Sequence, residues 1–111
     1  MDYIFDIMNK DELITSVNTT KEPMVITYNK KPGIQPFMGG IITKKRIESF
    51  LSTRVFDSGR PDTKELLTLL GLNEYVPYEI VKKTHGVLID DFTWIRFPEE
   101  RIKWNDIAIR K

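Results

Sequence analysis

One histidine, His85, limits the acid–base chemistry that this chain of 111 residues could perform. Serine–histidine and cysteine–histidine catalysis would both depend on it, yet the chain has no cysteine and no Gly-x-Ser-x-Gly segment to present a serine nucleophile. His85 follows Lys82 and Lys83 and precedes Gly86, and basic residues at this place complement the dipole at a helix C-terminus. We therefore interpret His85 as a helix-terminal residue without a catalytic role.

Paired carboxylates and metal ligands give no clearer site. Asp90 and Asp91 are adjacent, and neighbouring residues of an extended segment face opposite ways, so their carboxylates do not share one site. Gly39 and Gly40 lack the spacing of a phosphate-binding loop. The lone histidine and the absence of a spaced ligand set predict no enzymatic activity, no catalytic residues, no essential metal and no cofactor.

Charge argues against nucleic acid as the main partner. Seventeen Lys and Arg residues oppose sixteen Asp and Glu residues, for a net charge of +1. A helix-turn-helix made of the segments that begin near Asp62 and Pro77 would need a shorter connector than residues 71–76. A DNA-associated regulator is the weakest alternative. The basic run Lys44-Lys45-Arg46 could attract an acidic partner, but such a run is more typical of a solvated helix face.

Length and composition predict one domain that spans residues 1–111. Forty-one per cent of the residues are hydrophobic, which is ordinary for a soluble globular protein. The absence of cysteine fits a reducing compartment, and no apolar run approaches the roughly 20 residues of a membrane span, so we expect a cytoplasmic protein.

The pattern along the chain predicts an α+β fold in four parts. Residues 1–29 read as an antiparallel three-stranded meander, because three β-branched and aromatic runs are separated by polar turns. Residues 30–42 form a loop rich in Gly and Pro, and residues 43–86 read as short helices. Residues 87–111 return to strand-like patterns and predict a small C-terminal β unit with strands at Phe92–Phe97, Arg101–Trp104 and Ile107–Ile109.

Three helices are predicted between residues 43 and 86. Thr43 is the expected N-cap of the first, and Asp62 and Glu65 form a capping pair for the second, which Gly71 ends. The third begins at Pro77 and ends at Gly86. We expect the meander to pack on helices centred near Phe50 and Leu67, with Trp94 and Trp104 in the core.

Several segments between Ile42 and Ile109 occur in a recognisable order. They are an arginine-flanked helix end, a Leu-rich helix, a Gly-hydrophobic segment that leads to an Asp-aromatic run, and a final Trp-containing segment. In the order of the chain, the eight segments are Arg46-Ile47-Glu48-Ser49-Phe50-Leu51, Arg54-Val55-Phe56, Ser58-Gly59-Arg60, Glu65-Leu66-Leu67, Leu70-Gly71, His85-Gly86-Val87, Asp91-Phe92-Thr93-Trp94-Ile95 and Lys103-Trp104-Asn105-Asp106-Ile107. In order and spacing they resemble the leader region that precedes the kinase in HipA-like proteins of Firmicutes. The chain departs from that pattern at Asp90, where serine is common.

The resemblance implies a free-standing version of a kinase accessory region. The chain has no phosphate loop, no His-Arg-Asp segment and no Asp-Phe-Gly equivalent, so we expect no phosphorylation by this protein alone. Split HipA-like systems include a small separate protein that restrains the kinase, and the leading hypothesis is a HipS-like antitoxin or regulator of a separate HipA-like kinase. The alternative is an inhibitor encoded by a phage or mobile element that blocks a host protein.

A binding module of this kind needs exposed aromatic, Met or Arg anchors. The Gly/Pro loop offers Phe37 and Met38, and the segment that follows the first helix offers Arg54, Phe56 and Arg60. We predict that these five residues form the partner-binding surface. The alternative for each residue is local structure, with Phe37 folded under its own loop and the arginines holding helix ends.

Overall fold

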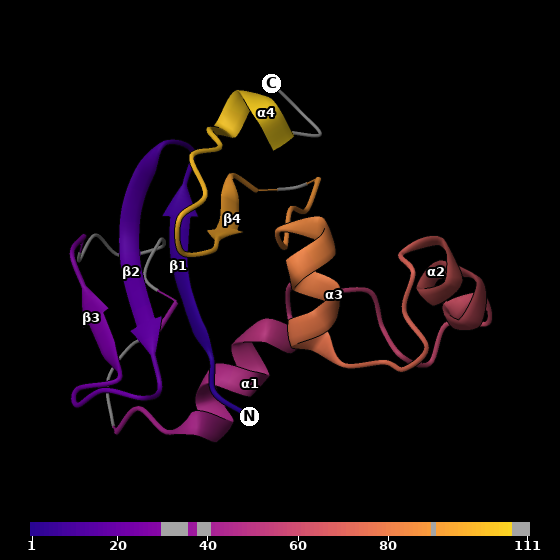
Figure 1. The fold of residues 1–111 in the computed structure, drawn as a ribbon, viewed down its shortest axis with the longest axis horizontal. Coiled ribbons are helices and arrows are strands. Elements are labelled where there is room, and N and C mark those ends of the chain that lie inside the picture. Colours follow the sequence, from indigo (N-terminus) through magenta and orange to yellow (C-terminus); the bar gives the residue numbers. More distant parts are fainter. Residues whose placement is uncertain (30–35, 38–40, 90, 108–111) are drawn as a thin grey trace.

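A four-stranded antiparallel sheet forms the centre of the computed structural model, which describes residues 1–29, 36–37, 41–89 and 91–107 (Figure 1). Its strands are β1 (Ile4–Asn9), β2 (Glu12–Asn18), β3 (Val25–Thr27) and β4 (Thr93–Arg96), in the spatial order β3-β2-β1-β4. The predicted N-terminal meander is confirmed. The fourth strand comes from the far end of the sequence and pairs with β1.

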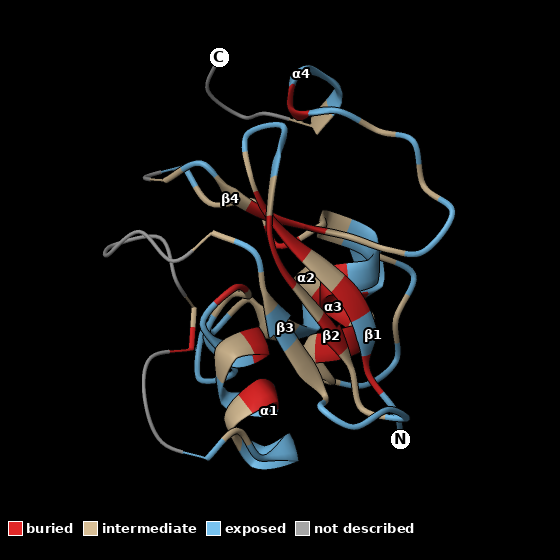
Figure 2. Ribbon diagram, turned by 90° about the vertical axis from the view of Figure 1, so that its left-hand side faces the viewer, coloured by how far each residue is buried: buried red, intermediate tan, exposed pale blue. Residues whose placement is uncertain are grey.

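Alternation along the strands buries one face of the sheet under helices. Phe5 opposes Val17, and Ile7 opposes Thr15, so these side chains share a face. The register then shifts between Ile7 and Met8, and both residues are buried. Figure 2 shows the buried residues concentrated along the central strands and on the adjacent sides of the helices.

Helix α1 (Lys44–Ser52) and helix α3 (Pro77–Thr84) pack against this face. Thr43 caps α1 as predicted, because its hydroxyl accepts a hydrogen bond from the backbone N–H of Arg46 at 3.2 Å. The first core cluster joins ten buried residues from the sheet, the helices and the loop before α1: Tyr3, Phe5, Ile7, Val17, Phe37, Ile47, Leu51, Tyr78, Val81 and Ile95. Phe50 packs on its border, with its ring 6.5 Å from that of Phe5.

Helix α2 (Thr63–Leu69) does not cover the sheet, so the expectation of packing there through Leu67 is wrong. It lies in a projection at one side of the molecule, and α3 takes the place expected for it (Figure 1). Asp62 makes no capping hydrogen bond, because its carboxylate binds Arg60 instead. Gly71 ends the helix as predicted, with φ at 76° and its N–H donated to the carbonyl of Thr68.

The C-terminal segment also differs from the prediction. Within residues 87–89 and 91–107, only β4 is a strand, and Trp104–Ile107 form the short helix α4 instead of extending a β unit. Asp106 accepts the N–H of Lys103 at 2.8 Å, and Asp11 accepts the N–H of Trp104 at 2.9 Å, which are helix-type caps. Residue 109 lies outside the described residues.

Both tryptophans are buried, as predicted. Trp94 is 0% exposed and Trp104 is 6% exposed, and together with Met8 they form a second core cluster. The indole N–H of Trp94 donates to the carbonyl of Lys10 at 2.6 Å, which ties β4 to the β1–β2 turn. The second cluster thus joins the C-terminal segment to the sheet.

Candidate protein-binding surface

Arg54 is a framework residue rather than a surface anchor. It is 7% exposed, and its guanidinium donates to the backbone carbonyls of Gly86 at 3.0 Å and Thr93 at 2.6 Å. The same group binds both carboxylate oxygens of Asp91, at 2.8 and 2.9 Å. These hydrogen bonds lower the pKa of Asp91 below its ordinary value, although partial burial of the carboxyl opposes the effect. The expectation that Arg54 faces a partner is therefore corrected.

Phe37 is likewise buried, with 7% of its surface exposed. Its ring lies 5.6 Å from that of Phe50, so it packs on α1 as part of the first core cluster. It is no more available to a partner than Arg54 is. Met38 lies outside the described residues.

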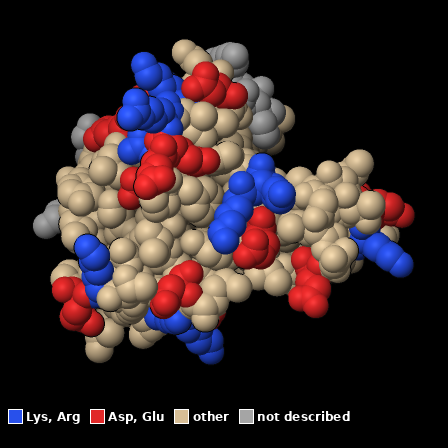
Figure 3. Space-filling view, viewed as in Figure 1, with Lys and Arg blue, Asp and Glu red and all other residues tan. Residues whose placement is uncertain are grey.

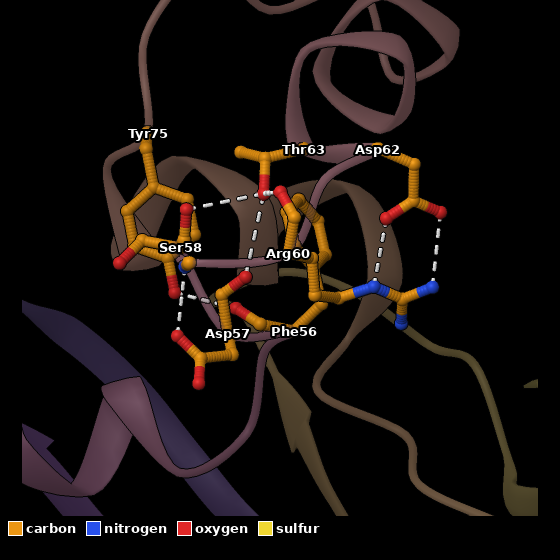
Figure 4. A network of polar contacts seen from close by, with 8 residues as sticks. Phe56, Asp57, Ser58, Arg60, Asp62, Thr63 and Tyr75 are labelled. Atoms are coloured by element: carbon orange, nitrogen blue, oxygen red, sulfur yellow. Dashed lines mark hydrogen bonds and ion pairs between the residues drawn. The ribbon is translucent and has the colours of Figure 1, made fainter.

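Phe56 and Arg60 belong to the projection that contains α2, and we call residues 56–75 the lobe (Figure 4). The ring of Tyr75 packs edge-on against that of Phe56 at 5.6 Å, and the Tyr75 hydroxyl donates to the carbonyl of Phe56 at 2.5 Å. Arg60 binds both carboxylate oxygens of Asp62, at 2.9 and 3.0 Å, and this lowers the pKa of Asp62. The contacts between Phe56 and Tyr75 thus hold the two ends of the lobe together at its base.

The lobe exposes apolar surface. Leu69 is 82% exposed and lines a shallow depression on α2 together with Lys64, Glu65 and Thr68. Figure 3 shows this projection largely free of charged groups on the face in view, with Lys, Arg, Asp and Glu at its rim. Of the five residues predicted as anchors, Arg60 is exposed and Phe56 is partly exposed, and both lie here.

A groove of about 260 Å³ opens where the lobe meets the helices. The groove is lined by the residue that precedes β1, by residues of α1, and by the start of α3 with the two residues before it: Tyr3, Glu48, Leu51, Ser52, Tyr75, Val76, Pro77 and Tyr78. The Tyr3 hydroxyl donates to the Glu48 carboxylate at 2.5 Å. Burial and then this hydrogen bond raise the pKa of Tyr3 to about 12.

Sequence reasoning missed this groove. Its residues come from positions 3, 48–52 and 75–78, and only the long-range packing of β1 against α1 and α3 brings them together. No local spacing signals such a site. The absence of Lys and Arg from the segment at 75–78 is the one sequence feature that hints at it.

His85 takes a structural position. It occupies the C-cap of α3 with φ at 58°, and its Nε2 lies 2.9 Å from a carboxylate oxygen of Glu100. Its ring packs edge-on against those of Trp94 and Phe97. The basic run Lys44-Lys45-Arg46 lies in the first turn of α1. The Nζ atom of Lys44 lies 3.6 Å from the Asp2 carboxylate.

Other possible sites are few in the described ranges. Within residues 1–29, 36–37, 41–89 and 91–107, no group of three or more His, Cys, Asp or Glu residues is arranged to hold a metal ion. In the same part of the chain, no helix is long and apolar enough to cross a membrane.

Comparison with known proteins adds no assignment. No protein-family model, curated protein or solved structure matches this chain.

Proposed function

We propose that this protein is a non-catalytic protein-binding module that acts as a HipS-like antitoxin or regulator of a separate HipA-like kinase. The observation that carries the proposal is the lobe. It has its own hydrogen-bonded base and stands outside both core clusters, and yet it exposes 82% of Leu69. Local order combined with exposed apolar surface is typical of a surface that binds another protein.

The lobe carries side chains of the kinds that anchor protein interfaces. A chain that binds without a covalent link needs roughly 800 Å² of contact per partner, and a few well-placed anchors supply most of the binding energy. Leu69, the exposed part of Phe56 and Arg60 provide apolar, aromatic and guanidinium groups on one projection. The lobe can therefore enter a hollow on a partner without disturbing the core.

The choice of a HipA-like kinase as partner rests on the resemblance of residues 42–109 to the leader region of that family. The surface charge is compatible with a protein partner rather than with DNA, since basic and acidic groups are interspersed over the face in Figure 3. Helix α3, which a helix-turn-helix would place in the major groove, buries Tyr78, Ile80 and Val81 against the body of the protein.

Co-expression with a HipA-like kinase that lacks a leader region tests the proposal. We expect the wild-type chain to relieve kinase-dependent growth arrest and to coelute with the kinase in size-exclusion chromatography. Leu69→Ser should weaken both effects, whereas Ile89→Ser, at another residue that is 66% exposed, should not.

Two results would contradict the proposal. One is that the folded wild-type chain fails to bind or restrain the kinases of this class. The other is that it binds a different host protein and leaves the kinase unaffected, which would favour the inhibitor from a phage or mobile element.

A further inference from the structure

We infer that the groove at the base of the lobe binds the guanidinium group of an arginine side chain on the partner protein. This inference rests on the proposed function, because it names the chemistry that the partner presents. The groove combines three tyrosines with one carboxylate: Tyr3, Tyr75, Tyr78 and Glu48.

The three tyrosine hydroxyls are engaged, so the tyrosines present ring atoms to the groove: Tyr75 is half-buried, and Tyr3 and Tyr78 expose only 6% and 7% of their surface. The hydroxyl of Tyr3 is donated to Glu48, that of Tyr75 to Phe56, and that of Tyr78 lies 3.2 Å from the N–H of Ile4. Tyr3 and Tyr78 pack edge to face with ring centroids 4.9 Å apart. Aromatic rings attract cations through their electron-rich faces, so this lining suits a cationic group.

Two lysines already show that these rings attract positive charge. The Nζ atom of Lys82 lies 4.6 Å from the Tyr78 ring centroid, and that of Lys44 lies 5.9 Å from the Tyr3 centroid. Each lysine has its own acidic partner, since Lys82 pairs with Glu79 at 3.4 Å and Lys44 with Asp2 at 3.6 Å. Neither lysine belongs to the lining of the groove.

Glu48 supplies the carboxylate of this groove. Among the described residues its carboxylate makes no ion pair, and its partner is the neutral hydroxyl of Tyr3. A second groove, whose lining includes Glu74, shares Val76 with the first. Neither lining includes Lys or Arg, so the connected surface is complementary to a basic segment of a partner.

The geometry favours arginine over lysine. A planar guanidinium can stack on a tyrosine ring while it donates hydrogen bonds to a carboxylate, whereas an ammonium is a compact, strongly hydrated charge. The volume of about 260 Å³ is near the lower limit for small-molecule sites, which are roughly 300–1,000 Å³, and it matches a single side chain better than a larger ligand.

A titration of the full chain with N-acetyl-arginine methylamide, followed by NMR, tests the inference directly. We expect saturable shifts at the backbone amides of Glu48, Ser52 and Tyr75. The neutral isostere N-acetyl-citrulline methylamide should bind about tenfold more weakly or not at all, because it cannot form the charge-assisted hydrogen bond. N-acetyl-lysine methylamide should also bind more weakly.

Glu48→Gln is the key variant, because glutamine can still accept the Tyr3 hydroxyl while it removes the charge. We expect it to weaken arginine-probe binding about tenfold, while Glu22→Gln, at an exposed position before β3, leaves binding unchanged. Equal binding of the arginine and citrulline probes, tighter binding of the lysine probe, or no effect of Glu48→Gln would overturn the inference.

The same variants separate this inference from the proposed function. If the kinase binds wild type and Glu48→Gln equally and the arginine probe does not bind, the groove assignment fails while the proposed function stands. If the arginine probe binds as described but the kinase does not, the groove stands and the proposed partner is wrong.

Discussion

Replacement of Arg54 by methionine should destabilise the protein strongly, because the guanidinium satisfies two backbone carbonyls and one carboxylate in a site that is 7% exposed. Methionine keeps much of the apolar stem. Each hydrogen bond from a charged donor contributes about 1.5–3 kcal/mol, and a carbonyl left unsatisfied in a buried site adds to the loss.

The ion pair itself contributes less than the carbonyl contacts. The Asp91 side chain is 39% exposed, and solvent screening reduces such a pair to about 1 kcal/mol or less. We therefore expect Arg54→Met to lower the free energy of unfolding by about 3–5 kcal/mol, with most of the loss coming from the carbonyls of Gly86 and Thr93. Asp91→Asn should have a smaller effect.

Urea unfolding measured by tryptophan fluorescence provides the assay, since Trp94 is fully buried beside Thr93. Arg60→Met is the matched control: Arg60 also binds a carboxylate through two hydrogen bonds, but its side chain is 50% exposed. The control should leave the unfolding midpoint unchanged. If both arginine variants shift the midpoint by the same small amount, the reasoning from buried carbonyls is wrong.

The Asp91 contribution also has a defined pH dependence. Arg54 lowers the pKa of Asp91 in the folded state, so this stabilisation is complete above the unfolded-state value of about 3.9 and is lost as the pH falls through the lower folded value. The stability difference between wild type and Arg54→Met should stay constant between about pH 5 and pH 8 and narrow below about pH 4.

Three further predictions test other parts of the structure. Trp104→Ala should lower the unfolding free energy by about 3–5 kcal/mol, because the side chain is 6% exposed in the second core cluster, and an unchanged midpoint by circular dichroism would contradict that placement. Gly86→Ala should destabilise more than Gly71→Ala: both glycines have positive φ, but a Cβ at residue 86 would lie 3.2 Å from side-chain atoms of Arg54 and Ile95, whereas a Cβ at residue 71 meets no atom within 4 Å. If the two glycine variants lower the melting temperature equally, the close contact of a Cβ at residue 86 makes no contribution. Tyr3 should ionise near pH 12 in an absorbance titration, and since its folded pKa lies above the unfolded value near 10, stability should fall as the pH rises from 10 to 12; ionisation of all four tyrosines near pH 10 would disprove the buried hydrogen bond.

Local signals in the sequence predicted the local parts of the fold. The Thr43 cap and the Gly71 helix end depend on atoms within a few residues, so the residue types alone indicate them. The hairpin of β1 and β2 depends on two apolar runs that flank a short turn. The burial of Trp94 follows from its place in an aromatic and β-branched run.

The parts of the fold that the sequence did not predict depend on contacts between residues far apart in the chain. Arg101–Trp104 alternates like a strand, but the segment ends in α4 because Asp11, far away in sequence, accepts the N–H of Trp104. The outer edge of β4 also has one of its backbone groups paired already, since the N–H of Ile95 donates to the carbonyl of His85 at 2.7 Å. Alternation does not make a strand unless a neighbouring strand offers free backbone groups to pair with.

The binding surface was the least predictable part, for the same reason. Residue type made Arg54 and Phe37 good candidates for anchors, because both types are frequent in interfaces. Their burial is decided by partners distant in sequence: the Arg54 guanidinium binds residues 32 to 39 positions away. Glu48 and Tyr3, by contrast, have no feature of sequence that marks them as neighbours.

Several of the segments on which the proposed resemblance to the HipA-like leader region rests contact one another. Arg54, from the second segment, binds Gly86, Asp91 and Thr93 from two later ones. Trp94 and Trp104, from the last two segments, share the second core cluster. The buried residues of these segments therefore hold the framework together, and substitutions at Arg54, Trp94 or Trp104 alter stability before they alter binding. A test of function must instead use positions that the framework does not need, such as Leu69 on the lobe and Glu48 in the groove, where a loss of binding in a fully stable variant identifies the surface itself.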